Sequence, residues 1–195
     1  MKKTTLSPVA LAAVILLVMT SGGCGPSAKK FARFENPVLE NIPSQKVLVI
    51  ELKGDPKVTS GEAFSRLYPA YFRIKSRQKS FRPPAPRARW TGDPAAPDSL
   101  VGAFALPVPE DATSLPAGSD PRLKIETWPY GETAVILHKG PYADEKPTID
   151  RLNAFIREKG YRVVGVHEEE YITPPTANPS KMLTIIRYRV ERTAP

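Results

Sequence analysis

The chain has 195 residues, of which 28 are Lys or Arg and 20 are Asp or Glu, so its formal net charge is +8. This length allows one domain with its own core and is short for two. The single cysteine excludes an intramolecular disulfide. A basic chain raises the question of nucleic acid, but the N-terminal sequence indicates export, where anionic lipid is the more available partner.

The N-terminus has the pattern of a secretory signal. Two lysines precede an apolar run over residues 9–19, which ends in the small residues of "TSGGC". The run is shorter than the roughly 20 apolar residues that span a bilayer. Cys24 follows Ser-Gly-Gly, which resembles a bacterial lipobox with Ser where Leu is usual. We expect residues 1–23 to be a cleaved signal peptide and Cys24 to carry lipid. The alternative is an ordinary cleaved signal followed by a stray cysteine.

A lipidated Cys24 would make the protein an exported lipoprotein, anchored to a membrane on the periplasmic face of a bacterial envelope. Gly25 is not the Asp associated with inner-membrane retention in Gram-negative bacteria, so the outer membrane is favoured there. Residues 24–44 show neither a helix nor a strand period and are expected to be a tether. The folded domain is expected over residues 45–192.

The folded part contains an internal repeat. Residues 47–72 and 133–158 both run from an apolar strand through Lys-Gly and Pro into a helical pattern. Thr59 and Glu62 are spaced as a capping box for the first helix, and Asp144 is the expected N-cap of the second. Further strands are predicted at 87–91, 99–108, 123–128, 161–172 and 181–190. The order indicates an α+β fold, with duplicated β-α-β-β repeats forming an antiparallel sheet and two helices on one face.

Three consecutive glutamates lie in the strand predicted at 161–172. Because side chains alternate across a strand, Glu169 shares a face with Tyr171, while Glu168 and Glu170 share the other. At most one face is fully solvated if this strand helps to form a core. Two alternatives stay open, namely a solvated strand end that exposes all three carboxylates and a strand interrupted by a bulge.

A family resemblance rests on two stretches. "HKGPYADEKPTIDRLNAFIREKGYRVVGVHEEEYITPP" followed by "MLTIIRYRV" is similar to the second half of the GyrI-like (gyrase-inhibitor-like) small-molecule-binding domain, and "RWTGDP" followed by "AFALPVP" is similar to its middle. This domain also serves as the effector-binding module of AraC-type and multidrug-responsive regulators and is related to the SOUL fold. The resemblance covers about residues 45–192. It implies helices on one sheet face and, on the other, a concave aromatic pocket whose carboxylate recognises cationic or amphipathic ligands.

The resemblance assigns the pocket carboxylate to Glu169, from the Glu-x-Tyr pattern. The side chains expected to line the pocket with it are Tyr171, Trp90, Phe104, Tyr68 and Met182. Trp128 and Tyr142 are expected to pack rather than to contact a ligand. With only His138 and His167 available, no metal and no haem or other cofactor is expected.

Three functions are compatible with these residues. The favoured one is a lipoprotein that binds a small molecule without turnover. The second is a hydrolase of a reactive, cyclopropane-type lipophilic compound with Glu169 as its catalytic carboxylate. The third is a structural or partner-binding lipoprotein whose pocket is filled by its own side chains. No nucleic-acid partner is expected, and an exported protein would not meet gyrase.

A basic, proline-rich segment runs from Arg73 to Arg89 without an acidic residue. One interpretation places this segment on anionic lipid, where each basic side chain near the surface adds about 1 kcal/mol. The other is a solvated insertion with no partner.

Overall fold

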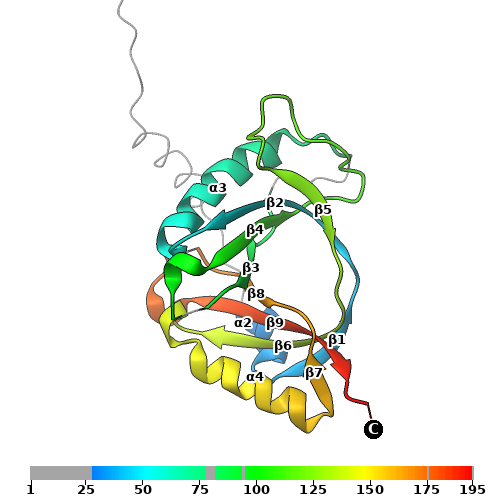
Figure 1. Ribbon diagram of the computed structural model, residues 1–195, viewed down its shortest axis with the longest axis vertical. Helices are drawn as coiled ribbons and strands as arrows, with labels where there is room; N and C mark the ends of the chain where they lie inside the picture. Colours follow the sequence, from blue (N-terminus) through cyan, green and yellow to red (C-terminus); the bar gives the residue numbers. More distant parts are fainter. Residues whose placement is uncertain (1–27, 78–81, 94, 175, 195) are drawn as a thin grey trace, which may run out of the picture.

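The computed structural model describes residues 28–77, 82–93, 95–174 and 176–194 (Figure 1). The predicted signal peptide and Cys24 lie outside these residues. Within the described ranges, no helix has the length and apolar character needed to cross a bilayer.

A single antiparallel sheet curls into a half-barrel (Figure 1). Its order is β1-β6-β9-β8-β3-β4-β2-β5, and the short β7 pairs with β9. The strands are β1 (Val38–Ile42), β2 (Gln45–Lys53), β3 (Arg87–Thr91), β4 (Val101–Pro107), β5 (Lys124–Trp128), β6 (Gly131–Lys139), β7 (Tyr161–Val163), β8 (His167–Tyr171) and β9 (Leu183–Arg192). The pairing of β3 with β8 joins the two repeats, so these two strands form the seam of the half-barrel.

Two long helices cover the outer face of the sheet. Helix α3 (Pro56–Arg73) packs on β2 and β4, and α4 (Lys146–Glu158) packs on β6 and β7, one helix for each repeat (Figure 1). The remaining helical elements are short, namely α2 (Ala28–Phe31) and the 3-10 turns η1 (Ala32–Phe34), η2 (Pro97–Ser99), η3 (Tyr142–Asp144) and η4 (Pro179–Lys181). The predicted α+β fold of duplicated repeats, with two helices on one sheet face, is confirmed.

Both long helices begin at a different residue from the one predicted. The Asp55 side chain caps α3 by accepting a hydrogen bond of 2.8 Å from the backbone N–H of Lys57, one turn before the expected cap at Thr59. Glu145, rather than Asp144, occupies the cap position of α4, yet its side chain makes no capping hydrogen bond. That side chain is instead buried in the fold. At the other end of α4, Gly160 has a φ of +74°, the left-handed conformation that ends helices.

Each face of the sheet has its own core. Leu48 and Phe104 pack beneath α3, and Ile136 and Ile186 pack beneath α4. The concave face carries smaller clusters, in one of which Phe34 of η1 packs on Val135, Leu137 and Ile185. Strand β1 pairs with β6 along the edge of the sheet. Part of the segment expected to be a tether therefore belongs to the sheet, because its apolar residues complete the concave face.

The strand predicted over 161–172 is interrupted in its middle. Gly165 lies between β7 and β8, and a Cβ atom at this position would lie only 2.9 Å from the Cβ of Arg189. Glycine therefore lets the chain lie close to β9 at the break between the two segments. As a result β7 pairs with β9 alone, while β8 lies between β9 and β3.

Candidate ligand-binding site between the two helices

Glu169 lies on the outer, helix-covered face of the sheet. Its cross-strand neighbours are Ala88 of β3 and Ile186 of β9, which pack in the cores beneath α3 and α4. The resemblance led us to expect this carboxylate on the concave face, opposite the helices. The difference arises because each helix covers the strands of its own repeat, so the seam strands β3 and β8 lie between the helices. We refer to the Glu169 region as the inter-helix site.

Glu168 and Glu170 point to the concave face, where arginines from both neighbouring strands surround them. Glu168 accepts hydrogen bonds of 2.8 Å from Arg89 Nε and from the Tyr130 hydroxyl. Arg187 of β9 lies 3.6 Å from Glu168 and also hydrogen-bonds Glu170. Only 3% of Glu168 is exposed. These contacts exclude a solvated strand end for the three glutamates.

The pKa of Glu170 shows the strength of this ion network. Burial by itself would raise the pKa, but the charges of Arg187 and Arg87 outweigh burial and lower it. Arg87 lies 3.4 Å from Glu170. Arg87 and Arg89, the last two cations of the basic segment, are thus committed to the interior and are not available to lipid.

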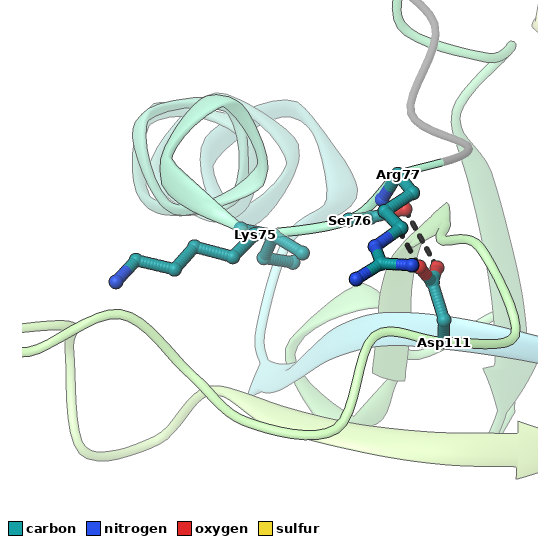
Figure 2. A pocket seen from close by; sticks show the side chains of 5 residues that line it. Lys75, Ser76, Arg77 and Asp111 are labelled. Carbon is teal, nitrogen blue, oxygen red and sulfur yellow. Dashed lines mark hydrogen bonds between the residues drawn. The ribbon is translucent and has the colours of Figure 1, made fainter.

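The rest of the basic segment begins at the end of α3, beside a surface hollow (Figure 2). Asp111 accepts hydrogen bonds of 2.6 Å from the Ser76 hydroxyl and 3.0 Å from the Arg77 backbone N–H, and these bonds lower its pKa. Figure 2 shows Lys75 extending away from this group. At this hollow, the loop after β4 is hydrogen-bonded to the segment that follows α3. Both carboxylate oxygens of Asp111 already accept hydrogen bonds from the chain itself.

The polar centre of the inter-helix site consists of Glu169, His167, Glu145 and Tyr188. His167 Nε2 lies 2.9 Å from Glu169 Oε1, and its Nδ1 lies 2.8 Å from the Tyr188 hydroxyl. Glu145 reaches Glu169 from the start of α4 and is only 5% exposed. Two carboxyl groups and an imidazole thus meet beneath the helices.

The surroundings of Glu145 keep its carboxyl group protonated. Burial, the charge of Glu169 and a hydrogen bond with Glu169 raise the pKa of Glu145 to about 9, so Glu145 is protonated near neutral pH. Burial and the negative charges of Glu169 and Glu145 raise the pKa of Tyr142 to about 12. The centre therefore holds a neutral carboxylic acid beside Glu169, with tyrosines that remain neutral.

Aromatic rings surround this centre on the side of α3. Phe64 lies with its ring centroid 5.6 Å from that of Phe104 and 6.4 Å from that of Tyr171, both in edge-on contact. Trp90 packs edge-on against Phe104 at 5.2 Å. Gly102 makes this packing possible, since a Cβ there would lie 2.6 Å from the Phe104 ring.

The structure brings the four predicted aromatic residues together. Tyr68, Trp90, Phe104 and Tyr171 belong to or pack against one cluster beneath α3. Met182 is buried at the residue before β9, where its carbonyl accepts a hydrogen bond from Gly140.

Three residues at or beside the site were missed or interpreted differently from the sequence. Tyr142, expected only to pack, does pack edge-on against Tyr171 at 5.4 Å, but it is 39% exposed and forms the rim of the site. Phe64 was not among the residues predicted to line the pocket. Glu145 was not considered, although its position three residues after Tyr142, in the turn that leads into α4, was a usable signal.

The concave face also carries a hollow, of about 520 Å³, lined in part by Arg89, Glu126 and Trp128. The Arg89 guanidinium lies 4.0 Å from the centroid of the Trp128 ring, and the indole N–H donates to Glu126. Trp128 therefore packs within the protein, as predicted. We call this region the concave hollow.

A half-barrel of two repeats, each with its own outer helix, defines an α+β domain with a candidate ligand site at the seam. Residues 35–189 match the family described as the GyrI-like small molecule binding domain. The chain belongs to this family, so its core is a small-molecule-binding domain. No curated protein sequence matches the chain significantly.

Solved structures share this fold. An uncharacterized conserved protein from Listeria innocua is 24% identical, with a TM-score of 0.74, covering 85% of this chain and 97% of the other. A protein described as a hydrolase from Listeria innocua is 22% identical, with a TM-score of 0.68, covering 84% and 96%. SAV2435 bound to tetraphenylphosphonium is 11% identical, with a TM-score of 0.51, covering 80% and 94%. At these identities the likeness concerns the fold alone.

Proposed function

We propose that the domain binds a small aromatic molecule with a cationic centre in the inter-helix site. One observation carries this proposal: among the described residues, Glu169 has no arginine or lysine within ion-pair distance, and its one basic contact is His167 Nε2 at 2.9 Å. The other two glutamates of β8, in contrast, each form ion pairs with two or three arginines. A buried carboxylate without a paired cation is costly, and a ligand cation would offset that cost.

The surroundings of Glu169 favour an aromatic ligand. Rings attract a cation placed over their faces by about 0.5–2 kcal/mol, and Trp90, Tyr171 and Tyr142 lie at or beside the carboxylate. The Glu169 side chain is 12% exposed and Tyr142 is 39% exposed, which leaves a route from solvent. The fold neighbour SAV2435 was solved with tetraphenylphosphonium, an aromatic cation, and this supports the proposed ligand class.

Titration of tetraphenylphosphonium into the full chain tests the proposal. Glu169→Gln keeps the size of the side chain and removes its charge, so we expect at least tenfold weaker binding of the cation. A neutral analogue, triphenylphosphine oxide, should lose much less. Glu158→Gln, at the exposed end of α4, is the matched control for a general loss of negative charge and should leave binding unchanged.

The same titration has outcomes that contradict the proposal. If Glu126→Gln weakens the cation while Glu169→Gln does not, the ligand occupies the concave hollow instead. Absence of binding by the wild-type chain would favour the alternative in which its own side chains fill the site.

A second candidate function is hydrolysis of a reactive lipophilic compound. The contact between a protonated Glu145 and Glu169 favours it, because a carboxylic acid held beside a second carboxyl group can supply the proton that such a reaction needs. Glu169 would take a proton from a water molecule while the oxygen of that water attacks a strained ring carbon. Glu145 would protonate the group released by ring opening. Mass spectrometry of a cyclopropane-containing substrate would show the addition of one water. Glu145→Gln and Glu169→Gln should both abolish this product.

We also propose that Cys24 carries lipid and anchors the domain to a membrane on the periplasmic face of a bacterial envelope. The small residues before Cys24 and the signal-like start of the chain support this assignment. Cys24→Ser should release the exported protein from the membrane fraction, because lipid chains contribute about 0.8 kcal/mol for each buried CH₂. Unchanged fractionation would contradict the anchor.

A further inference from the structure

The inter-helix site also has the composition of a metal site. Glu145, His167 and Glu169 each offer one ligand atom, and these three atoms lie within 4.8 Å of one another. Glu145 lies at the start of α4, and His167 and Glu169 lie at alternate positions of β8. The helix and the seam strand thus fix the positions of the three side chains. The sequence analysis expected no metal because the chain has only two histidines. Proximity in the fold changes this expectation, since one imidazole and two carboxylates are a sufficient set of ligands.

Glu145 supplies an independent observation that points to a ligand. Its Oε1 atom is buried and has no hydrogen-bond partner among the described residues, and the residue is 5% exposed. Buried polar atoms in native proteins almost always have a partner, so an orphaned carboxylate oxygen beside another carboxylate calls for one. No arginine or lysine of the described ranges ion-pairs with either carboxylate.

The imidazole is held as in known metal centres. The Tyr188 hydroxyl lies 2.8 Å from His167 Nδ1 and fixes the ring, and Nε2 is presented toward Glu169. Histidines that bind metal almost always have their second ring nitrogen hydrogen-bonded in this way. The other histidine, His138, has both ring nitrogens engaged, by Thr148 and by the Pro141 carbonyl, and is not available.

We propose that Glu145, His167 and Glu169 bind one divalent transition-metal ion, with Zn²⁺ as the best match. An imidazole nitrogen disfavours Mg²⁺ and Ca²⁺, which prefer oxygen ligands alone. Three protein ligands leave a position for water or for a ligand atom, as in catalytic zinc sites. The inference goes beyond the proposed organic ligand and does not depend on it. The metal ion and an aromatic cation would compete for the same two carboxylates.

Titration of the untagged full chain, after dialysis against a chelator, tests the site. Zn²⁺ binding is measured by calorimetry, and Co²⁺ binding by the visible absorption that inner-sphere coordination produces. We expect one ion per chain, with at least tenfold weaker binding in Glu145→Gln, His167→Gln and Glu169→Gln. Asp144→Asn is the matched control, because it removes an exposed carboxylate next to Glu145 and should keep wild-type affinity.

Two results would overturn the site: a wild-type chain that binds no ion at one-to-one stoichiometry, or variants that all keep the wild-type affinity. If Glu145→Gln does not fold, judged by its thermal unfolding, the His167→Gln variant decides. Tetraphenylphosphonium is titrated separately into the metal-free chain. Binding of this cation without binding of Zn²⁺ removes the metal inference and retains the proposed function. Binding of Zn²⁺ without binding of the organic cation removes the proposed function and retains the metal inference.

Discussion

Glu168 and Glu169 are adjacent residues of the same type, so replacing each by Gln separates the two faces of β8. We expect Glu168→Gln to destabilise the fold strongly. Glu168 accepts two hydrogen bonds of 2.8 Å, from Arg89 and Tyr130, and two further guanidinium groups lie at 3.6 and 3.9 Å. Without this charge, Arg89 would lose its ion pair, and Arg87 and Arg187 would keep only Glu170.

The size of the effect follows from burial. Breaking a buried ion pair by removing one partner costs about 3–5 kcal/mol, because the other charge is left uncompensated. Gln keeps one acceptor oxygen and so retains part of the hydrogen bonding, which places the expected loss in unfolding free energy near 3 kcal/mol. Glu169→Gln should change stability by less than about 1 kcal/mol, since Gln can still accept the hydrogen bond from protonated Glu145.

Thermal unfolding followed by circular dichroism measures the difference. For a domain of this size, about 3 kcal/mol corresponds to a fall in Tm of roughly 6–12 °C. The two variants carry the same change in net charge, so general electrostatics cancels between them. Equal shifts in Tm, or a larger shift for Glu169→Gln, would refute the assignment of the two carboxylates to opposite faces.

Three further predictions concern stability. Because the pKa of Glu170 is lower in the folded than in the unfolded chain, its charge stabilises the fold at pH values above the unfolded-state pKa. This stabilisation is lost as the pH falls through the folded-state pKa. Glu170→Gln should therefore weaken the fall of Tm at acid pH in a plot of Tm against pH. Gly102→Ala should lower the unfolding free energy by about 1–3 kcal/mol in urea titrations, because the added Cβ would meet the rings of Trp90 and Phe104; wild-type stability would contradict the close approach. Asp55→Ala should lower the unfolding free energy by about 1 kcal/mol through loss of the α3 cap. Thr59→Ala should not have this effect, and a larger loss for Thr59→Ala than for Asp55→Ala would instead support the capping box predicted from the sequence.

Much of the fold could be predicted because its signals are local. The strand at 87–91 was predicted with the bounds observed, and the repeat placed both helices and the strands before them. Strand β1 and the turn η1 were not predicted as elements, because segments of five and three residues show no clear period and are fixed by pairing with β6 and by packing on the concave face. The break at Gly165 likewise depends on Arg189, a contact between residues far apart in the chain.

The site could be predicted only in part. Alternation along β8 correctly separated Glu169 from its two neighbours, since the period of a strand is a local property. Which face those side chains meet depends on how the two helices divide the sheet, and the sequence carries no local signal for that. Glu145 escaped notice for the same reason: its side chain leaves the cap position and turns inward to Glu169, a contact made across 24 residues of chain.

The seam between the repeats explains why a basic protein places three carboxylates in one strand. Cross-strand pairs of β3 and β8 set Arg87 opposite Glu170 and Arg89 opposite Glu168, so opposite charges face each other on the concave side and hold the halves together. The pairs that alternate with them, on the outer side, are Ala88 with Glu169 and Trp90 with His167. The alternation that neutralises one face leaves, on the other, a carboxylate without an arginine or lysine beside it. The ion network thus keeps the seam closed while Glu169 remains free to meet a ligand between the helices.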